Sequence, residues 1–457
     1  MSLLRDLPFN SWGWDANIAA AAKELSKLPL YIDRGKDVNQ PPSVNGYVAR
    51  KVNSNSIFRG GELFAENPER ESAGPYISQF LAQEIPYGTL RISQRGIWAR
   101  ANIDYMAERD DWVTVQNGAN RDPQLNLVGL RPEESDLRRH ISTMRDLATY
   151  VHFDQLYEAY LNAALILVQG GYELDEGNPY GGTCPAFGHG GSSSTNRACI
   201  GVNQEGFGAF GGPQILSLVT EASTRALKAV WRQKWTHLRL RPEAYGGLIA
   251  FRPGSIPGGS KLVKTSQAFK ISKKKHPSGL LPMAFPEGSP MHPAYGAGHA
   301  TVAGACVTML KAFFNENAPV QELVVASECG TELIPYTGPD AAALTVGLEL
   351  DKLAANISIG RNMAGVHWRS DYTQSVLLGQ RVAVDILYRQ SCDYLEDYSF
   401  GFTTFGGGKV TISSKGVHYL SGLASKTSTP KLILPGNPER IARNKDRVIA
   451  NALLAIV

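Results

Sequence analysis

Apolar residues recur at helical spacing along most of this chain. In several long segments hydrophobic positions return every three to four residues, which is the period of one buried helix face. These segments are residues 17–28, 135–171, 213–242, 299–315, 339–358 and 371–392. Strand patterns are few, with short runs at 409–413 and 431–435. The pattern predicts a mainly α-helical fold of two packed helical bundles, with long loops and minor β structure.

Proline and glycine indicate where some of these helices begin and end. Pro213 suits the first turn of a helix, and Pro242 limits the same segment at its far end. The pair Gly170-Gly171 stops the segment 135–171. Loop-rich stretches at 178–213 and 243–298 are expected between the helices.

Length and composition are those of a large enzyme. The 457 residues exceed the usual size of a single hydrophobic core, and 43% of them are apolar. We expect an N-terminal extension at 1–57 and a helical-bundle domain at 58–400. The remainder, 401–457, is expected to pack on the core or in an oligomer interface.

The net charge of +4 is small for this length and argues against nucleic acid or a membrane as the main partner. A local cationic pocket for a small anion is still compatible with it. No segment is apolar enough to span a bilayer, and the first residues lack the apolar core of a secretory signal. The chain is therefore expected to be soluble, in a compartment that the sequence leaves open.

The five cysteines show no spacing typical of a metal site. Cys184 and Cys199 bracket a Gly/Ser-rich loop and could form a disulfide or remain two free thiols. Cys306 lies in an apolar helical segment and is expected to be a buried, inert thiol. Cys329 and Cys392 have no evident partner within the chain.

Two other motifs carry little weight. "GFGAFGG" (206–212) contains G-x-G-x-x-G, but no strand precedes it, so a turn before a helix is favoured over dinucleotide binding. "SKKKH" (272–276) is either a solvated loop or a cationic rim that steers anions toward a site.

"KWTHLRLRP" (234–242) is a stronger candidate for anion binding. If it is one helix, Lys234 and Arg241 lie two turns apart on the same face and can approach one anion together. Arg239 should then point elsewhere. The alternative for such a pair is a solvated helix face.

"HPAYGAGHATVAGA" (292–305) places Gly298 and His299 at the start of a helix. Free backbone N–H groups and the helix dipole favour an anion at such a position. His299 could serve there as an acid or base, or could simply cap the helix or lie buried.

"SIGRNMAGVHWRSD" (358–371) supplies a third set of candidates. Gly360 and Gly365 suggest a loop that leads into a helix near His367. Asp371 lies four residues after His367 and could orient its imidazole, as carboxylates do for metal-binding histidines. The alternatives are a surface cation for Arg361 and a buried structural histidine for His367.

Taken in order, Lys-x6-Arg-Pro, Gly-His and Arg-x5-His resemble the signature of the vanadium haloperoxidase and acid phosphatase superfamily. The chain is more closely similar to the vanadium bromoperoxidases of red algae and cyanobacteria, over roughly residues 57–385. "FRGGELF", "GPYISQFLAQEIPYG", "HPSGLLPMAFPEGSPMHPAYGAGHATVAGA" and "GRNMAGVHWRSD" carry this resemblance.

The resemblance implies a vanadate site in the bundle, with each role taken from the matching position. His367 would bind vanadium, and His299 would hydrogen-bond the distal oxygen and move protons. His292 would tune a halide pocket, or be a structural loop histidine. Asp371 would orient the imidazole of His367 without contacting vanadate itself. The remaining oxygens of vanadate would contact Lys234, Arg241, Arg361 and the backbone N–H of Gly298.

One position departs from the family pattern. Ala297 stands where the family usually has a serine whose hydroxyl donates to a vanadate oxygen. Losing a hydrogen bond to a charged group costs on the order of 1.5–3 kcal/mol. The resemblance therefore leaves cofactor affinity and peroxide activation at this site open.

The activity that the resemblance implies is oxidation of bromide and iodide by hydrogen peroxide, with chloride a poor substrate. The hypohalous-acid equivalent would then halogenate an electron-rich organic acceptor. One alternative is an acid phosphatase with His367 as nucleophile and His299 as general acid. Another is a non-catalytic anion-binding or assembly protein.

The resemblance also implies partners beyond the site. Red-algal relatives form large symmetric assemblies, so a homo-oligomer in which dimers assemble further is expected. Some members carry structural calcium, for which "NQEGFGAF" (203–210) lies in the relevant neighbourhood.

Overall fold

The computed structural model describes residues 6–7, 9, 16–25, 59, 73–180, 204–252 and 263–420. Its α-helices are α2 (Ala16–Leu25), α4 (Arg109–Gln116), α5 (Met144–Phe153), α6 (Glu158–Gln169), α7 (Gly212–His237), α8 (Pro242–Phe251), α10 (Gln267–Lys275), α11 (Gly298–Phe313), α12 (Val346–Ala364) and α13 (Arg369–Ser391). Short 3-10 turns are η5 (Gln79–Leu81), η6 (Pro132–Leu137) and η9 (Ala341–Ala343). The predicted mainly helical fold is confirmed.

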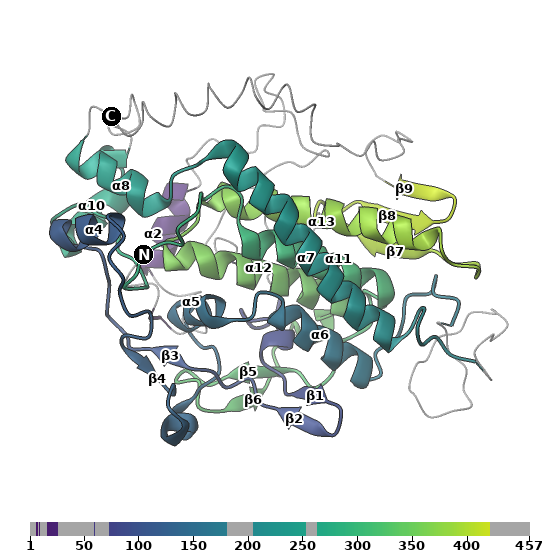
Figure 1. Ribbon diagram of the computed structural model, residues 1–457. Coiled ribbons are helices and arrows are strands. Elements are labelled where there is room, and N and C mark those ends of the chain that lie inside the picture. The colour runs from purple at the N-terminus through teal and green to yellow at the C-terminus, as the bar shows by residue number, and fades with distance from the viewer. Residues whose placement is uncertain are drawn as a thin grey trace, which may run out of the picture.

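Helix α11 forms the centre of the molecule. It is buried from Ala300 to Phe313, and α7, α12 and α13 pack around it, as Figure 1 shows. Farther out, α5 packs on α12 and α6 packs on α7. A helix that is mostly apolar and buried on every side, as α11 is, is stable inside such a bundle.

Glycines allow α11 and α13 to touch backbone to backbone. A Cβ atom built on Gly304 of α11 would lie 2.1 Å from the carbonyl oxygen of Val376, and one on Gly379 of α13 would lie 2.0 Å from that of Thr301. Any larger residue at either position would push the two helices apart. The N-terminal ends of both helices are therefore fixed relative to each other.

The predicted long helix at 135–171 is two helices. Helix α5 begins at a capping box between Thr143 and Asp146, and it ends at Asp154, which has an extended backbone (φ −62°, ψ 149°). Helix α6 follows and ends at Gly170, as expected. Apolar residues on both sides of the break keep helical spacing, so the core stays covered. For the same reason the apolar pattern of the sequence gives no sign of the break.

Strands are short and peripheral (Figure 1). Antiparallel pairs join β1 (Ile85–Tyr87) to β2 (Leu90–Ile92), β3 (Trp98–Ala99) to β4 (Leu127–Val128), and β5 (Val324–Ala326) to β6 (Leu333–Pro335). A three-stranded antiparallel sheet runs β7 (Phe400–Thr403), β8 (Lys409–Ser413), β9 (Gly416–Leu420) and packs on α11 and α13. The strand at 409–413 is confirmed, while 431–435 lies outside the described residues.

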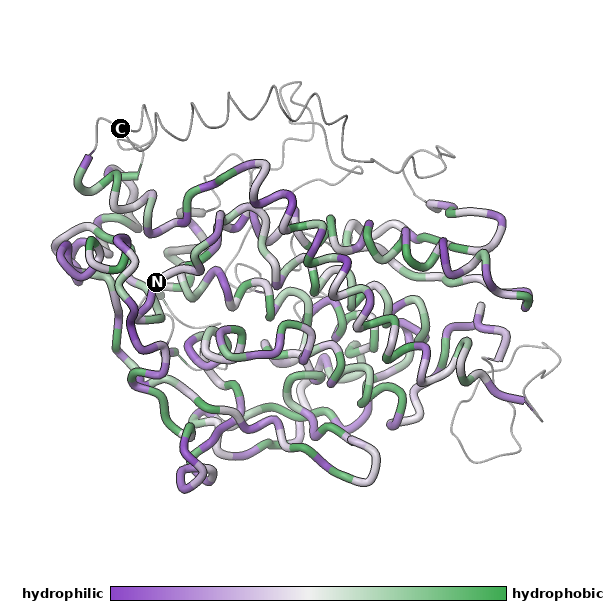
Figure 2. The backbone as a smooth tube through the Cα atoms, in the orientation of Figure 1, coloured by the Kyte–Doolittle hydropathy of each residue, from purple (hydrophilic) through white to green (hydrophobic). Residues whose placement is uncertain are grey.

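The expected division into 1–57, 58–400 and 401–457 stays a prediction, because most of both ends lies outside the described residues. Figure 2 shows hydrophilic segments in the outer loops around α4 and α10, whereas the bundle helices alternate between hydrophobic and hydrophilic positions. In the part of the chain that the structure describes, no helix has the length and apolar character needed to cross a membrane.

The described cysteines are free thiols. Cys306 is fully buried in α11, where burial raises the pKa of its thiol, as expected of an inert residue. Cys329 and Cys392 are exposed. Cys184 and Cys199 lie outside the described residues, so their state stays open.

Two minor motifs have different outcomes. The stretch "GFGAFGG" forms a turn that leads directly into α7, as expected. "SKKKH" is not a loop, because Ser272–Lys275 form the last turn of α10. Lys275 and His276 both contact Asp104, at 3.0 and 3.2 Å, while Lys273 and Lys274 are exposed.

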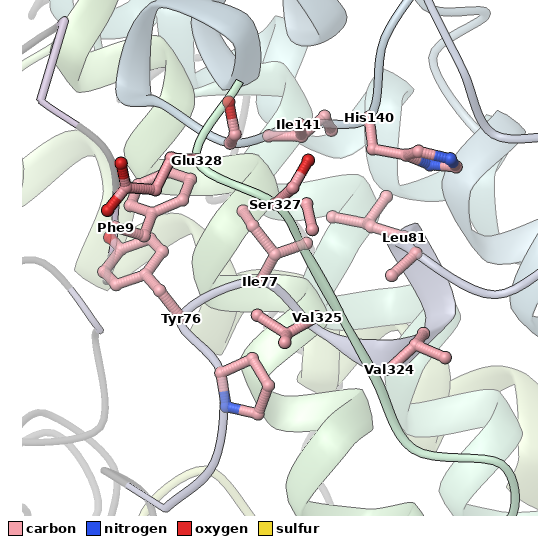
Figure 3. A pocket seen from close by; sticks show the side chains of 14 residues that line it. Phe9, Tyr76, Ile77, Leu81, His140, Ile141, Val324, Val325, Ser327 and Glu328 are labelled. Carbon is pink, nitrogen blue, oxygen red and sulfur yellow. The ribbon is translucent and has the colours of Figure 1, made fainter. Parts of the chain in front are cut away.

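A small apolar cleft opens between the N-terminal segment and the β5–β6 hairpin (Figure 3). Phe9 and Tyr76 stack on one side of it, with ring centroids 4.3 Å apart. Ile77, Leu81 and Val325 provide further apolar lining. None of its lining residues is a candidate from the sequence, so it is separate from the site described next.

Candidate active site

Lys234 and Arg241 do meet, but by a different route from the one predicted. Helix α7 ends at His237, and Leu238 takes a left-handed conformation (φ 49°). Arg241 is then the N-cap of α8 rather than part of α7. The expected single helix face is wrong, and the turn at Leu238 brings both cations to the loop that begins at His292.

Arg241 is the hub of the site. Its Nε donates to the carbonyl oxygen of His292 (3.1 Å), and its Nη1 donates to that of Val366 (2.8 Å). Nη1 also lies 3.0 Å from His367 Nε2, and Nη2 lies 3.0 Å from His292 Nδ1. Burial and then Arg361 lower the pKa of this guanidinium to about 10. One planar cation thus holds two histidines from different loops.

Lys234 is buried, with 1% of its surface exposed. Its Nζ donates to the carbonyl oxygens of Pro293 (2.9 Å) and Ala294 (3.3 Å). Burial lowers the pKa of this ammonium to about 7, and the positive charge of Arg241 contributes further. The ammonium has no carboxylate partner within salt-bridge distance among the described residues.

Arg361 approaches from the opposite side, on the last turn of α12. The loop expected around Gly360 is wrong, since α12 continues to Ala364 and ends at Gly365. Arg361 Nη1 donates to the carbonyl oxygen of Val151 (2.9 Å), and its guanidinium lies over the Phe285 ring. Its buried Nε has no hydrogen-bond partner in the described part of the chain.

His367 lies between α12 and α13 and is oriented by Asp371, as predicted. Its Nδ1 is 3.0 Å from Asp371 Oδ2, which also accepts a hydrogen bond from the backbone N–H of Trp368 (3.0 Å). Burial and the nearby cations, Arg241 first, lower the pKa of His367 well below its usual value. The ring is therefore neutral, with its proton on Nδ1 and its lone pair on Nε2.

Arg239 was expected to point away from the site, and this expectation is wrong. Its Nη1 donates to Asp371 Oδ1 (2.9 Å) and to Ser370 Oγ (2.7 Å), and its guanidinium lies over the Trp368 ring. Asp371 therefore has a cationic partner on one oxygen and the His367 ring on the other. Reading 234–242 as one helix concealed this contact.

His299 lies in the first turn of α11, as predicted. Its Nε2 is 3.0 Å from Asp154 Oδ1. Asp154 is 3% exposed and follows α5, and sequence reasoning missed it because it placed this residue inside a continuous helix. Only a prediction that the backbone is extended between two helices would have singled out Asp154, and the apolar spacing gave none.

Ala297 and Gly298 form the start of α11. Ala297 is the N-cap and gives α11 no side-chain cap, while its backbone N–H donates to Ser375 Oγ (2.9 Å). A Cβ atom built on Gly298 would meet no described atom closer than Leu227 Cδ1, at 3.5 Å. This is an ordinary van der Waals contact, so Leu227 packs beside the start of the helix.

His292 is half-buried beside Arg241. Its Nδ1 faces Arg241 Nη2, and the edge of the Trp231 ring packs against it with centroids 5.2 Å apart. Burial, followed by the charges of Lys234 and Arg241, lowers the pKa of His292 to about 4. The ring is neutral at physiological pH and accepts a hydrogen bond from the arginine.

These residues form a buried cluster with excess positive charge. Arg241 and Arg361 lower the pKa of Lys234, and Arg361 also lowers the pKa of Arg241. Of the nearby carboxylates, Asp371 and Asp154 bond to Arg239 or to histidines instead. Glu243 and Glu287 raise the pKa values of Arg241 and Arg361, but among the described residues they form no salt bridge with them. Burying like charges together is unfavourable unless an anion joins them. The geometry is that of a site for a compact oxyanion.

The described residues give no support to a calcium site. No group of three or more His, Cys, Asp or Glu side chains among them could hold a metal ion. Residues 204–210 of the candidate stretch are described, whereas Asn203 is not. Structural calcium therefore stays a prediction from resemblance.

Comparisons with known proteins agree with this geometry. The family model described as "VCPO second helical-bundle domain" matches residues 214–396, which span α7 to α13. The vanadium-dependent bromoperoxidase of Corallina officinalis is 42% identical, covering 90% of this chain and 72% of the relative. That of Corallina pilulifera is 36% identical with the same coverage, and that of Ascophyllum nodosum is 29% identical, covering 92% and 72%.

The solved structures give the same answer. The homohexameric structure of the second vanadate-dependent bromoperoxidase from Ascophyllum nodosum matches with a TM-score of 0.73 and 25% identity, covering 92% of this chain and 70% of that one. Fold and sequence therefore point to the same family. This chain belongs to the vanadium-dependent bromoperoxidase family.

Proposed function

We propose that this chain is a vanadate-dependent haloperoxidase that oxidises bromide and iodide with hydrogen peroxide. The product is a hypohalous-acid equivalent that halogenates an organic acceptor. The observation that carries the proposal is the buried, under-neutralised cluster of Lys234, Arg241 and Arg361 around the neutral ring of His367. The anion is proposed to be vanadate because the relatives are vanadium-dependent bromoperoxidases.

The residues present fit vanadate on three counts. Arg361 Nε is buried without a hydrogen-bond partner among the described residues, so it can donate to an added oxygen. The N-cap residue Ala297 gives α11 no side-chain cap, so the first N–H groups of the helix can donate to an anion. His367 Nε2 carries the lone pair, because Nδ1–H is held by Asp371, and this lone pair would be exchanged from Arg241 Nη1 to the anion. An oxyanion with one coordination position for nitrogen uses all three features.

We assign roles on this basis. His367 Nε2 would bind the vanadium atom, and His299 would hydrogen-bond one of the vanadate oxygens. The other oxygens would be held by Lys234, Arg241, Arg361 and the backbone N–H of Gly298. When bound, vanadate supplies a Lewis-acidic centre that activates peroxide for attack by halide without a change in its own oxidation state.

The side chains around the anion are held in place before it binds. Asp371 fixes the tautomer and direction of His367, and Arg239 holds Asp371 in turn. Arg241 is fixed by two backbone carbonyls, those of His292 and Val366. Charged donors that are already oriented stabilise developing negative charge far better than mobile ones.

His299 is the residue that moves protons. Asp154 Oδ1 accepts from Nε2, which leaves Nδ1 to take a proton from peroxide and later return one. The carboxylate stabilises the imidazolium that forms, in the way that an aspartate supports histidine in other acid-base pairs. Asp154 is thus a positioning residue for His299.

His292 is proposed to border the halide position. It is kept neutral by Arg241 and lies at the outer edge of the cation cluster, beside Trp231. A neutral, polarisable rim between two ring systems suits the large, weakly hydrated bromide and iodide better than chloride.

The two alternatives gain no support. The relatives reported above are bromoperoxidases, and none of them is a phosphatase. An anion-binding protein without catalysis would not need an acid-base histidine held by a dedicated carboxylate, as His299 is by Asp154. Haloperoxidase chemistry uses every charged group of the cluster.

The test is vanadate-dependent halide oxidation. Anion-free protein is incubated with or without orthovanadate, then given peroxide and iodide or bromide, with a phosphate ester as a parallel substrate. We expect oxidation only with vanadate, and its loss in Arg361→Met. Arg225→Met, an exposed cation on α7, is the matched control and should remain active. Phosphate-ester hydrolysis without halide oxidation would refute the proposal.

We also propose that the chain forms a homo-oligomer of assembled dimers. The solved relative from Ascophyllum nodosum is homohexameric. Light scattering on the purified full chain should give a mass that is a multiple of the 49.6 kDa protomer. A single protomer mass at micromolar concentration would contradict this.

A further inference from the structure

A row of large apolar side chains lies exposed on the outer face of α7. Leu227, Trp231 and Trp235 are four residues apart, so they follow one another along the same side of the helix. Their exposed fractions are 37%, 45% and 51%. Tryptophan side chains are seldom so exposed without a reason, since each carries a large apolar surface.

The first two of these residues border the anion site. Leu227 Cδ1 lies 3.5 Å from a Cβ atom built on Gly298, and the Trp231 ring packs against His292. The cations behind them are buried, with Lys234 only 1% exposed. The Trp231 ring therefore borders any path to solvent that runs past His292.

We propose that Trp231 is a self-halogenation site, the first side chain that oxidised halogen meets as it leaves the active site. This inference rests on the proposed haloperoxidase function, which supplies the hypohalous acid. The indole is an electron-rich ring, and its half-exposed edge is held next to the route out. Holding a reactant in place in this way raises its effective concentration greatly.

The chemistry is an electrophilic aromatic substitution. An indole carbon attacks the halogen of hypobromous acid, so a C–Br bond forms while the O–Br bond breaks. The ring carbon then loses its proton, which combines with the departing hydroxide to give water. The indole is oxidised by two electrons and the halogen is reduced by two, so no further reactant is needed.

Trp235 provides a matched control within the same helix. Its ring centroid lies 5.8 Å from that of Trp231, and it is slightly more exposed than Trp231. Trp231 is the one whose ring packs against His292. Accessibility alone predicts that Trp235 reacts at least as fast as Trp231, whereas release from the site predicts that Trp231 reacts first.

The experiment compares two sources of the same oxidant. Vanadate-loaded protein is given peroxide and bromide at low turnover without an organic acceptor, and a second sample receives reagent hypobromous acid in small portions. Peptide mass spectrometry then measures bromine at each tryptophan. We expect turnover to label Trp231 several-fold more than Trp235, and reagent oxidant to label Trp235 at least equally.

Variants and outcomes separate this inference from the proposed function. Trp231→Phe should lose the turnover-specific label, and Trp235→Phe should keep it. Two outcomes would overturn the inference and leave the function intact. One is the same ratio of label between Trp231 and Trp235 from both sources, and the other is no label at Trp231 while iodide is still oxidised to triiodide. Absence of iodide oxidation itself would instead refute the proposed function.

Discussion

Two buried lysines in the same bundle have opposite electrostatic surroundings. Lys311, near the end of α11, lies 3.0 Å from Asp351 and 3.1 Å from Glu316, and these carboxylates raise the pKa of its ammonium. Lys234, at the active site, has only backbone carbonyls within hydrogen-bond distance among the described residues, and burial lowers its pKa to about 7. Both side chains are at least 98% buried.

The difference shows which cluster is structural and which is functional. The protein satisfies Lys311 completely, so that cluster holds α11 to the segment after it and to α12. It leaves the charge at Lys234 without a carboxylate, because a carboxylate there would compete with the anion. A buried charge that folding leaves unbalanced indicates a ligand.

The largest expected effect comes from breaking the balanced cluster. Lys311→Met leaves Asp351 and Glu316 without their cation, and removing one partner of a buried ion pair costs about 3–5 kcal/mol. Chemical denaturation of the anion-free protein should show this loss in the free energy of unfolding. The double variant Lys311→Met/Asp351→Asn should recover part of it, and an unchanged midpoint for Lys311→Met would contradict the comparison.

Lys234→Met should behave differently. Loss of two backbone hydrogen bonds is offset by relief of repulsion from Arg241, so the stability of the anion-free protein should change by no more than about 1 kcal/mol. Vanadate affinity should fall by about 1.5–3 kcal/mol, since a charge-assisted hydrogen bond is lost. Equilibrium dialysis with orthovanadate measures this, and unaltered affinity would remove Lys234 from the site.

The pH dependence of binding should sharpen the contrast. Without an anion, the folded-state pKa of Lys234 is about 7, below its ordinary value of 10.5, so stability rises with pH between these values. A bound oxyanion favours the charged ammonium and raises its pKa. Binding above pH 7 thus takes up a proton at Nζ, and affinity falls by up to about tenfold per pH unit.

This pH effect is isolated by difference. The ratio of dissociation constants between Lys234→Met and the unaltered protein cancels the titration of vanadate itself. The ratio should decrease as pH rises from 7 to 9. A ratio that is constant over this range would show that Lys234 is not the titrating group.

The smallest expected effect concerns Ala297. A serine at this N-cap position can accept a hydrogen bond from the second or third N–H of α11, which stabilises a helix by roughly 0.5–2 kcal/mol relative to alanine. Ala297→Ser should therefore raise the melting temperature without vanadate. If its hydroxyl donates to the anion instead, vanadate affinity rises and the anion-free melting temperature does not, so the two measurements separate the roles.

Helix positions were predictable from the sequence because apolar spacing decides them. The segments at 213–242, 299–315 and 371–392 correspond to α7, α11 and α13. Spacing cannot show a break that leaves this period intact, so the extended backbone at Asp154 was missed. The same limit placed Arg241 on α7, although a left-handed Leu238 ends that helix.

Site residues were predictable where sequence neighbours define them. His367 and Asp371 lie four residues apart and contact each other as expected. Contacts between segments far apart in the chain, such as His299 with Asp154, left no such signal. Arg239 was misjudged for the same reason as Arg241, because its direction depends on the turn that precedes it.

The contact between α11 and α13 through Gly304 and Gly379 has a practical consequence for protein engineering. His299 begins one of these helices and Asp371 begins the other, so main-chain atoms set the spacing across the site. Replacing side chains on the outer surface, or attaching the protein to a solid support, should leave that spacing unchanged. We therefore expect that substitutions in the 291–296 loop can change the halide position that we propose beside His292 without rebuilding the scaffold beneath it.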